Sequence, residues 1–407
     1  MNKQQLEKYL SYMRQDHLPV YDSEGKIKHP RHRPKWQNLD GLHLDYSEID
    51  GYQKRFNLIT SPREPGKSTG VIRKAYKYNF MFDWTTLFLV RYGADVDEGY
   101  AYDIEETINT FSPCKVKITQ KRQKSGAIDL YIAELGEDEN GKEEEFTQRL
   151  FGRILPMNIP SSRFKRAKIP HLKFIVMDEF VCDMIKNEKY LSAECQRFND
   201  IFTTYRRSQV KDGVGVVVYL LGNCYQTWSP YLDWAHFDSR KIRPGIVMKT
   251  ENHLFKHAKI KPELKEKILR ENPLYEFDED YKDFGLEGEA VNDKNIALLP
   301  HQPTGARLEY VFKMEGKYFG YFKIPAYAVE NSKLDFRYYC SKLKWNKEYK
   351  RVAFCFDFDN LENNSAILLS NQRKTLTYLA RCIANGQVGF DRVESEYATE
   401  QIFPKII

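Results

Sequence analysis

The segment from Phe56 to Thr69 has the residue types of a loop that holds phosphate groups. It reads FNLITSPREPGKST, an apolar run and a loop followed by Gly66-Lys67-Ser68 at the start of a helical pattern. In such a loop backbone N–H groups hold phosphate oxygens, a lysine neutralises their charge, and a serine hydroxyl binds Mg²⁺. A chance Gly-Lys-Ser is the alternative, since Ser61 stands where the usual G-x-x-x-x-G-K-[ST] pattern has its first glycine. The predicted nucleotide-binding residues are Arg63, Gly66, Lys67, Ser68 and Thr69.

Two adjacent carboxylates, Asp178 and Glu179, end a second apolar run that begins at Lys173. Side chains alternate along a strand, so the two acids project differently. Asp178 is expected to bind Mg²⁺ and Glu179 to polarise a water towards the γ-phosphate, although adjacent acids also often cap a helix. Their place in the chain, after an intervening strand, fits the additional-strand class of P-loop ATPases. This order favours hydrolysis over phosphoryl transfer to a small molecule.

Further polar side chains lie at the end of the next apolar run and at the end of the helix that precedes this run. Asn223 follows the strand expected over Val214–Leu221, and there it can either contact the γ-phosphate and the attacking water or only make a turn. Arg206 and Arg207 end the preceding helix. Arginine suits bidentate contact with a phosphoryl group of a neighbouring subunit, whereas cations also favour helix C-termini for structural reasons. Arg91, after another strand, is a further cation expected at the same edge of the sheet as Arg63.

Short apolar runs alternate with helical patterns in this part of the chain, which predicts a mostly parallel, doubly wound α/β sheet. The expected strands are Phe56–Thr60, Thr86–Val90, Phe174–Met177 and Val214–Leu221, and the expected helices are Lys67–Tyr78 and Leu191–Ser208. Asn140-Gly141, between Ala127–Leu135 and Glu145–Ile154, is a hairpin signal and predicts an inserted hairpin over about 121–154.

The flanking regions have different patterns and suggest further domains. Residues 1–50 combine a polar helix over about Lys3–Arg14 with a basic, proline-containing loop at Lys26–Lys35, which could contact nucleic acid or be a flexible arm. An ATPase domain is expected over 51–232, and a linker domain over 233–299 with a charged helix at Lys259–Asn272. A further domain over 300–407 is expected to contain strands Leu308–Phe312, Tyr318–Ile324 and Val352–Phe358 and a helix Ser370–Asn385.

Composition narrows the class of protein. With 42% hydrophobic and 14% aromatic residues, the 407-residue chain is not wholly disordered. A formal net charge of +6 is compatible with a polyanionic partner. No apolar run approaches the roughly 18–20 residues of a membrane span, and the N-terminus lacks an apolar signal-peptide segment. Seven cysteines without a C-x-x-C pair predict free thiols in a reducing cytoplasm.

Together these motifs resemble the phi29-type genome-packaging ATPases of small tailed phages, which are related to the large terminase ATPases. The resemblance extends from about Tyr52 to the C-terminus. It depends on Ile59–Ser68 with its internal Arg63, Thr86–Arg91, Phe174–Val181, Thr204–Arg206, Leu221–Asn223, Ser229–Tyr231 and Leu379–Asp391. No single motif is diagnostic, but their order is fairly specific.

The resemblance implies ATP and Mg²⁺ as cofactors and a role for each matching residue. Lys67 and Ser68 would bind nucleotide and Mg²⁺, Asp178 would bind the metal, and Glu179 would be the catalytic acid. Arg206 would be the trans-acting finger and Asn223 the coupling residue. The sequence departs from the family where a basic residue is expected after the second strand, because Gly93–Asp97 is acidic.

The resemblance also implies an architecture and partners. The fold would be a P-loop, RecA-like ATPase domain of the ASCE class, a small linker domain, and a C-terminal α+β domain resembling a degenerate RNase H nuclease. The family pumps double-stranded DNA into a preformed procapsid as a ring, usually a pentamer, docked at the portal, in some members with a packaging RNA. The expected location is the host cytoplasm, transiently at the portal vertex and not in the mature virion, with no membrane partner.

The C-terminal domain does not have the carboxylates of an active nuclease in an obvious arrangement. Metal-dependent cleavage needs several carboxylates that converge, and Glu309, Asp357, Asp359 and Asp391 are more often surface acids. A cluster of basic and aromatic residues in this domain is expected to bind nucleic acid or a docking partner, with an ordinary solvated face as the alternative. That cluster comprises Arg337, Lys342, Lys344, Lys347, Lys350 and Arg351 with Tyr338, Tyr339 and Trp345.

Three weaker alternatives stay open. His253 and His257 would share one helical face but have no third metal ligand nearby. A terminase-like subunit with an active nuclease is one other function. A P-loop protein that only senses nucleotide during assembly is the second, and Glu179 argues against it because a pure switch does not need this acid.

Overall fold

The chain divides into two compact units, which are described separately. The first comprises Met1–Tyr225 and Pro230–Glu289, and the second Gln226–Ser229 and Ala290–Ile407. The computed structural model describes residues 20–21, 27–28, 42–44, 46–63, 65–93, 98–112, 114–137, 143–160, 168–183, 188–209, 215–272, 275, 282–288, 290, 298–299, 301–330, 335–359 and 373–403. The helix expected at Lys3–Arg14, most of the loop at Lys26–Lys35 and the turn at Asn140-Gly141 lie outside these residues.

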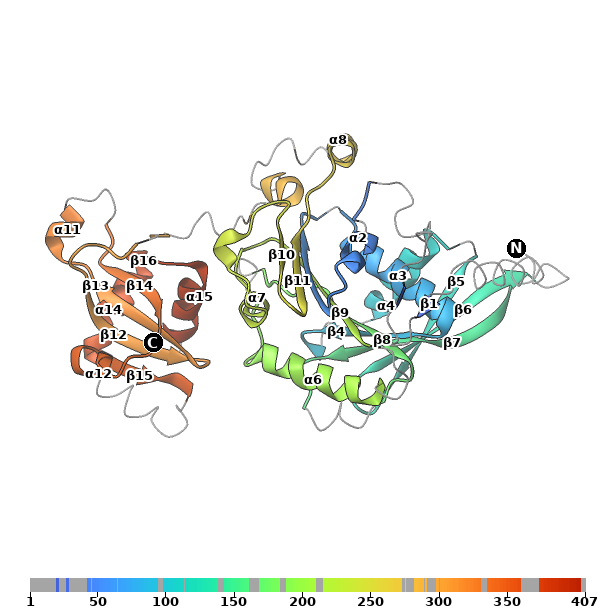
Figure 1. Cartoon of the computed structure of the whole chain (residues 1–407), viewed down its shortest axis with the longest axis horizontal. Helices are drawn as coiled ribbons and strands as arrows, with labels where there is room; N and C mark the ends of the chain where they lie inside the picture. Colours follow the sequence, from blue (N-terminus) through green and yellow to red (C-terminus); the bar gives the residue numbers. More distant parts are fainter. Residues whose placement is uncertain are drawn as a thin grey trace. The chain divides into compact units, whose positions relative to one another are not determined.

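The first unit is built on a nine-stranded sheet in the order β10-β11-β3-β9-β8-β4-β7-β6-β5 (Figure 1). The strands from β11 to β7 are parallel to their neighbours, while β10, β6 and β5 are antiparallel to theirs. Their bounds are Phe56–Ser61 (β3), Thr85–Val90 (β4), Val116–Arg122 (β5), Ile128–Glu137 (β6), Glu143–Pro156 (β7), Leu172–Met177 (β8), Val217–Asn223 (β9), Val247–Lys249 (β10) and His253–His257 (β11). A separate two-stranded pair, Val20–Tyr21 (β1) and Ile27–Lys28 (β2), precedes this sheet in the chain.

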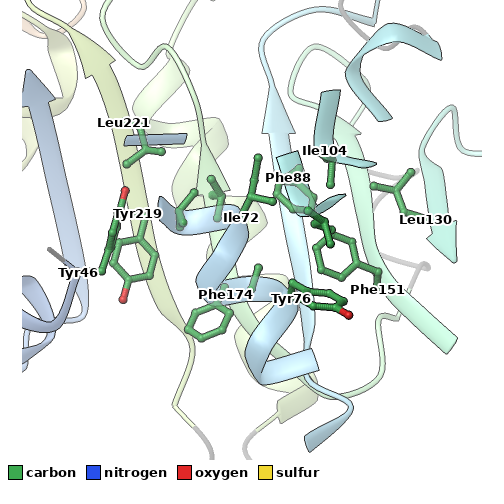
Figure 2. Packing of buried hydrophobic residues seen from close by; sticks show 14 of the residues in the cluster. Tyr46, Ile72, Tyr76, Phe88, Ile104, Leu130, Phe151, Phe174, Tyr219 and Leu221 are labelled. Carbon is green, nitrogen blue, oxygen red and sulfur yellow. The ribbon is translucent and has the colours of Figure 1, made fainter. Parts of the chain in front are cut away.

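Helices cover both faces of the sheet, which explains why its central strands read as continuous apolar runs. Every residue of β3, β4 and β8 is buried. Alternate residues enter two separate cores, with Phe88 and Phe174 in one and Leu87 and Ile175 in the other. Figure 2 shows the first core, in which Tyr76 of α3 and Ile104 of α4 lie over the strands. The bounds are Tyr46–Gly51 (α2), Lys67–Phe82 (α3), Glu98–Asn109 (α4), Glu194–Gln209 (α6), Pro230–Trp234 (α7) and Pro262–Glu271 (α8).

All the expected central strands and helices are present, and most of their ends lie within three residues of the expected positions. Two parts differ from expectation. The hairpin of β6 and β7 is not a peripheral insertion, because β7 pairs in parallel with β4 and β5 adds a further strand beyond β6. In the range expected as a linker domain, β10 and β11 join the main sheet, where β11 pairs with β3. His253 and His257 therefore lie on a strand, and the expectation of a shared helical face was wrong.

The strand order determines which loops meet. Strand β9 lies between β3 and β8, so the chain leaves three adjacent parallel strands at the same edge. At that edge Ser61 is directly opposite Asn223, and Asp178 follows the end of β8. Parallel sheets bring the carboxyl ends of their strands together, and ligands of such folds bind there.

The second unit contains a five-stranded sheet in the order β15-β12-β13-β14-β16. Strands β12, β13 and β14 form an antiparallel meander, β15 is parallel to β12, and β16 is parallel to β14. The bounds are Arg307–Met314 (β12), Lys317–Lys323 (β13), Ala326–Glu330 (α11), Tyr338–Leu343 (β14), Tyr349–Val352 (α12), Phe354–Asp357 (β15), Arg373–Ala384 (α14), Val388–Phe390 (β16) and Val393–Ile402 (α15). Residues of α14 and α15 form one core with these strands. Among all the helices of the described residues, none has both the length and the apolar character of a membrane span.

Candidate functional site

Lys67 is the central charged group at the carboxyl edge of the first sheet. It is the first residue of α3, and only 5% of its surface is exposed. Its ammonium donates hydrogen bonds to Ser61 Oγ (2.9 Å), Pro62 O (3.0 Å) and Asn223 Oδ1 (2.8 Å). Burial lowers the pKa of Lys67 to about 8, although the carboxylates of Asp178 and Glu179 act in the opposite direction. A buried ammonium with a lowered pKa favours an anionic ligand.

The backbone between Ser61 and Lys67 turns through a conformation that requires glycine. Gly66 caps α3 with φ of 73°, in the left-handed region. A Cβ at this position would also lie 3.0 Å from Cδ2 of His43. Because the first turn of α3 follows directly, its unpaired N–H groups and positive dipole end lie beside the Lys67 ammonium. Thr69 lies in this first turn, and Arg63 is exposed in the loop.

Ser68 and Asp178 join the loop to the end of β8. The Ser68 hydroxyl donates a hydrogen bond to Asp178 Oδ2, and the other carboxylate oxygen accepts the Glu179 N–H at 3.1 Å. A hydroxyl and a carboxylate are hard oxygen ligands of the kind that Mg²⁺ uses together with substrate phosphates and water. Within the described part of the chain, no group of three or more His, Cys, Asp or Glu residues could hold a metal by itself. The Ser68 and Asp178 oxygens fit a Mg²⁺ whose other ligands are phosphate oxygens and water.

Glu179 is exposed beside Asp178 on an unusual backbone. Its φ of 60° is in the left-handed region that residues other than glycine avoid. Arg91 stabilises this turn, because its guanidinium donates to the carbonyls of Glu179 (2.9 Å) and Phe180 (3.1 Å). The same guanidinium pairs with Glu194 at 3.0 Å, and both side chains are buried. Arg91 thus acts on the turn that carries Glu179, and it is not an exposed cation of the site.

Asn223 connects β9 to the loop. Its amide oxygen accepts from Lys67, and its amide nitrogen donates to the Tyr225 hydroxyl at 3.4 Å. The preceding Gly222 is closely packed, since a Cβ there would lie 3.1 Å from side-chain atoms of Phe180 and Val181. The structure therefore brings together Lys67, Ser68 and Asn223 with Asp178 and Glu179 at one edge of the sheet.

Sequence reasoning missed a short segment that supports the loop from outside. Leu44 N–H donates to Pro65 O at 2.9 Å, and the Tyr46 hydroxyl donates to Lys67 O at 2.7 Å. The Tyr46 ring lies so close to α3 that a Cβ on Gly70 would approach it to 2.5 Å. This segment lies in the range 1–50 that was expected to be a separate arm. One backbone hydrogen bond and one tyrosine side chain carry no sequence pattern that could have revealed it.

A buried polar network anchors the same segment. The Lys74 ammonium of α3 forms an ion pair with Asp50 and a hydrogen bond to the Tyr219 hydroxyl at 2.6 Å. The Tyr219 hydroxyl in turn donates to Asp50 Oδ1 at 2.7 Å. Burial lowers the pKa of Lys74, and Asp50 opposes that shift. The network joins α2, α3 and β9 beneath the loop.

A pocket of about 270 Å³ lies beside the loop on the side of this segment. Its position against Gly66 and the first turns of α3 places it next to the predicted phosphate site. His43 and Leu44 contribute one wall. The full lining consists of His43, Leu44, Arg63, Gly66, Thr69, Gly70 and Arg73.

A second segment packs on the other side of the loop through His257. Its Nδ1 lies 2.8 Å from Thr60 Oγ1 and its Nε2 lies 2.9 Å from the Gly288 carbonyl, so Nε2–H donates and Nδ1 accepts. Burial lowers the pKa of His257 to about 4, so the ring is neutral. Arg63 N–H donates to Gly285 O at 3.3 Å. The pair His253 and His257 is therefore used in packing, and a metal site there has no support among the described residues.

Arg206 lies away from these residues of its own chain. Helix α6 begins after the Glu179 turn and ends before β9 begins, so its last turn lies near the opposite edge of the sheet. Phe202, one turn before Arg206, packs on Phe56 at the start of β3 with ring centroids 4.8 Å apart. Arg206 is exposed there. A role in phosphoryl chemistry is therefore open to it only towards another copy of the chain.

The acidic residues of the second unit that were considered for a nuclease site have partners within that unit, and Glu309 accepts a hydrogen bond from the Tyr338 hydroxyl. Lys313 pairs with Asp357 (3.2 Å) and Asp359 (3.3 Å), and Asp359 also accepts the N–H groups of the β12–β13 turn. Asp391 pairs with Arg392 and follows β16, at the opposite edge of the sheet from β15. Among the described residues, Asp391 therefore does not form one cluster with Asp357 and Asp359.

The proposed basic and aromatic surface of this unit is smaller than the sequence indicated. Tyr338 and Tyr339 are buried, so neither is available to stack on a base, which corrects that expectation. Lys342 pairs with Glu394 at 2.8 Å, and Arg337 pairs with Asp335 at 3.1 Å. The cluster members that stay exposed are Lys344, Trp345, Lys347, Lys350 and Arg351.

The fold is similar to that of solved phage packaging motors. A chain of the Phi-28 gp11 DNA packaging motor is 16% identical, with a TM-score of 0.54 and coverage of 88% of this chain and 96% of that chain. A chain of the bacteriophage Phi-29 viral genome packaging motor assembly is 16% identical, also with a TM-score of 0.54, and the match covers 90% of this chain and 100% of that one. No family model and no curated protein matches the sequence. The chain thus has the fold of the phi29-type packaging ATPases, as the sequence motifs led us to expect.

Proposed function

We propose that this chain is an ATPase motor that moves double-stranded viral DNA into a preformed procapsid. The observation that supports it most directly is the contact set at one sheet edge. Lys67 binds Asn223 there, and Ser68 binds Asp178. The additional strand β9 between β3 and β8 is the arrangement expected of a P-loop ATPase of the ASCE class. The fold shared with the Phi-29 and Phi-28 motors supports DNA packaging as the process.

In this proposal each residue has a defined part in hydrolysis. The N–H groups of the loop and the Lys67 ammonium bind the β- and γ-phosphates. Ser68 and Asp178 hold Mg²⁺, which supplies positive charge to the phosphate oxygens. Glu179 orients and accepts a proton from the attacking water, and the turn fixed by Arg91 aims it. The hydrogen bond between Asn223 and Lys67 is kept or broken according to whether the γ-phosphate is bound. Asn223 so transmits the nucleotide state to β9.

The pocket beside the loop is proposed to take the nucleoside end of ATP. His43 and Arg73 offer an aromatic ring and a guanidinium at its wall, and both suit stacking against a flat base. The pocket adjoins Gly66 and Thr69, so a base placed there leaves its phosphates at the start of α3. This placement uses the segment before α2 as part of the nucleotide site.

The partners and location follow from the motor function and are proposed with it. A homo-oligomeric ring, on the family pattern a pentamer, would dock at the portal of the procapsid in the host cytoplasm. The exposed Lys344, Lys347 and Lys350 give the second unit a basic surface for nucleic acid, either the DNA or a packaging RNA. Cleavage of DNA is not part of the proposal, because Asp357 and Asp391 lie at opposite edges of the second sheet.

ATP turnover of the purified protein, with and without double-stranded DNA, tests the proposal. DNA should stimulate turnover. Lys67→Ala should abolish nucleotide binding, whereas Glu179→Gln should bind ATP and not hydrolyse it, because Lys67 contacts ground-state phosphates and Glu179 acts on water. Glu266→Gln, an exposed acid on α8, is the matched control and should behave as wild type. Equal loss of ATP affinity in the Lys67 and Glu179 variants would contradict the assigned roles.

A further inference from the structure

Arg55 lies immediately before β3, at the end of the strand opposite to the nucleotide loop. Its N–H donates to Asn252 O at 3.1 Å, and its carbonyl accepts the Val218 N–H at 2.8 Å. Its backbone is therefore held between β9 and the turn that precedes β11. Phe56, the next residue, packs on Phe202 of α6. This contact brings the last turn of α6, with Arg206, beside Arg55.

The two guanidiniums influence one another, and among the described residues no acidic side chain pairs with either. Partial burial lowers the pKa of Arg55, and the charge of Arg206 lowers it further. Within the described part of the chain, neither side chain takes part in a salt bridge or a hydrogen bond. Two like charges close together repel unless an anion lies between them. Two neighbouring arginines without a carboxylate are suited to a phosphate, which can accept bidentate hydrogen bonds from each.

The phosphate cannot come from the nucleotide bound by the same chain. Strand β3 has 6 residues and separates Arg55 from the loop at its other end. At about 3.3 Å per residue the strand spans roughly 17–20 Å, which exceeds the reach of an arginine side chain. The ligand of the pair therefore belongs to another molecule.

We propose that Arg55 and Arg206 form a two-arginine site that binds the γ-phosphate of ATP held by a neighbouring copy of this chain. The inference rests on the proposed ring ATPase and adds Arg55 to it as a second trans-acting residue. It also supplies a cation that this chain lacks after the second strand, where the family has a basic residue and the segment Gly93–Asp97 is acidic. A DNA backbone is the weaker alternative, because DNA-binding surfaces neutralise many phosphates and this site offers two charges.

Turnover and ATP affinity of Arg55→Gln, measured separately, test the site. ATP affinity should stay within about twofold of wild type, whereas turnover should fall about 10- to 100-fold, as for loss of a hydrogen bond to a charged group. Arg55→Lys keeps the charge but loses the bidentate geometry and should recover only part of the turnover. The matched control is Arg122→Gln, an exposed arginine at the end of β5, which should leave turnover unchanged. Circular dichroism of each variant checks that the fold is intact.

Mixed oligomers test whether Arg55 acts across an interface. Arg55→Gln protein retains Lys67, and Lys67→Ala protein retains Arg55, so a mixture contains interfaces with both residues intact. Mixing should raise hydrolysis above the sum of the turnovers of the two variants measured separately. Absence of restoration, or an Arg55→Gln turnover equal to that of the Arg122 control, would overturn the inference. Loss of only the DNA-stimulated turnover would assign Arg55 to DNA instead.

The result can be separated from failure of the proposed function. If wild-type protein does not hydrolyse ATP, or is fully active as a verified monomer, the ring ATPase itself is refuted. If wild-type turnover falls steeply on dilution and Arg206→Gln is inactive while Arg55→Gln is not, only the role of Arg55 is refuted.

Discussion

The affinity of the site for ATP should depend on pH through Lys67. Burial lowers the pKa of this ammonium to about 8 in the free protein. A bound triphosphate favours the charged form and raises that pKa, so binding takes up a proton when the pH is near or above 8. ATP affinity should therefore be at its highest below pH 8 and should fall as the pH rises above it.

The size of the effect follows from the pKa. With a pKa of about 8, about nine-tenths of the Lys67 side chains are charged at pH 7 and about one-tenth at pH 9. Affinity for MgATP should then be about tenfold weaker at pH 9 than at pH 7, since the phosphates stay ionised throughout this range. Fluorescent-nucleotide titration of the Glu179→Gln protein measures this without turnover.

Calorimetry supplies an independent measurement of the same proton. Binding enthalpies recorded at pH 8 in buffers of different ionisation enthalpy should report net proton uptake. Lys67→Arg is the control, because a guanidinium stays charged over this range and any residual affinity should be independent of pH. A constant affinity between pH 7 and pH 9 without proton uptake would refute the assignment of Lys67 as a buried, partly neutral phosphate ligand.

Three further predictions concern the support of the site and the second unit. Gly66→Ala should destabilise the protein by about 1–2 kcal/mol in urea unfolding and also weaken ATP binding, whereas Gly316→Ala, at φ of 74° with nothing within 4 Å of a Cβ, should affect stability alone. Asp50→Ala removes the carboxylate that pairs with the buried Lys74 ammonium and should lower the free energy of unfolding by about 3 kcal/mol. Adding Lys74→Met to this variant should recover part of the lost stability. The full chain should not nick plasmid in Mn²⁺, and nicking that disappears in Asp357→Ala would contradict this.

The central part of the fold could be predicted from the sequence because its signals are strong and local. Strands buried on both faces, such as β3 and β8, must be continuous apolar runs, and each ends in the polar residues that the chemistry needs. The edge of the sheet where Lys67, Asp178 and Asn223 meet then follows from the parallel arrangement. The shared fold with the packaging motors confirms this α/β architecture.

The supports of the site could not be predicted, because backbone atoms make most of their contacts. Leu44 N–H binds Pro65 O, and Arg63 N–H binds Gly285 O. Neither contact requires a particular side chain, so neither leaves a periodic pattern. The burial of both Tyr338 and Tyr339 was missed for a related reason. A strand with one solvated face would expose one of the two, but β14 has a separate apolar cluster on each face.

Strand β9 connects the two ends of the proposed mechanism. At its start Val218 N–H binds the carbonyl of Arg55, and at its end Asn223 binds the Lys67 ammonium. The strand between them is buried and packs between β3 and β8, so it can shift only as a unit with its neighbours. A change of phosphate at Lys67 that releases Asn223 would therefore alter the position of the strand start, where the proposed site of Arg55 and Arg206 lies. In a ring this is a direct physical route by which one nucleotide site affects hydrolysis at the next.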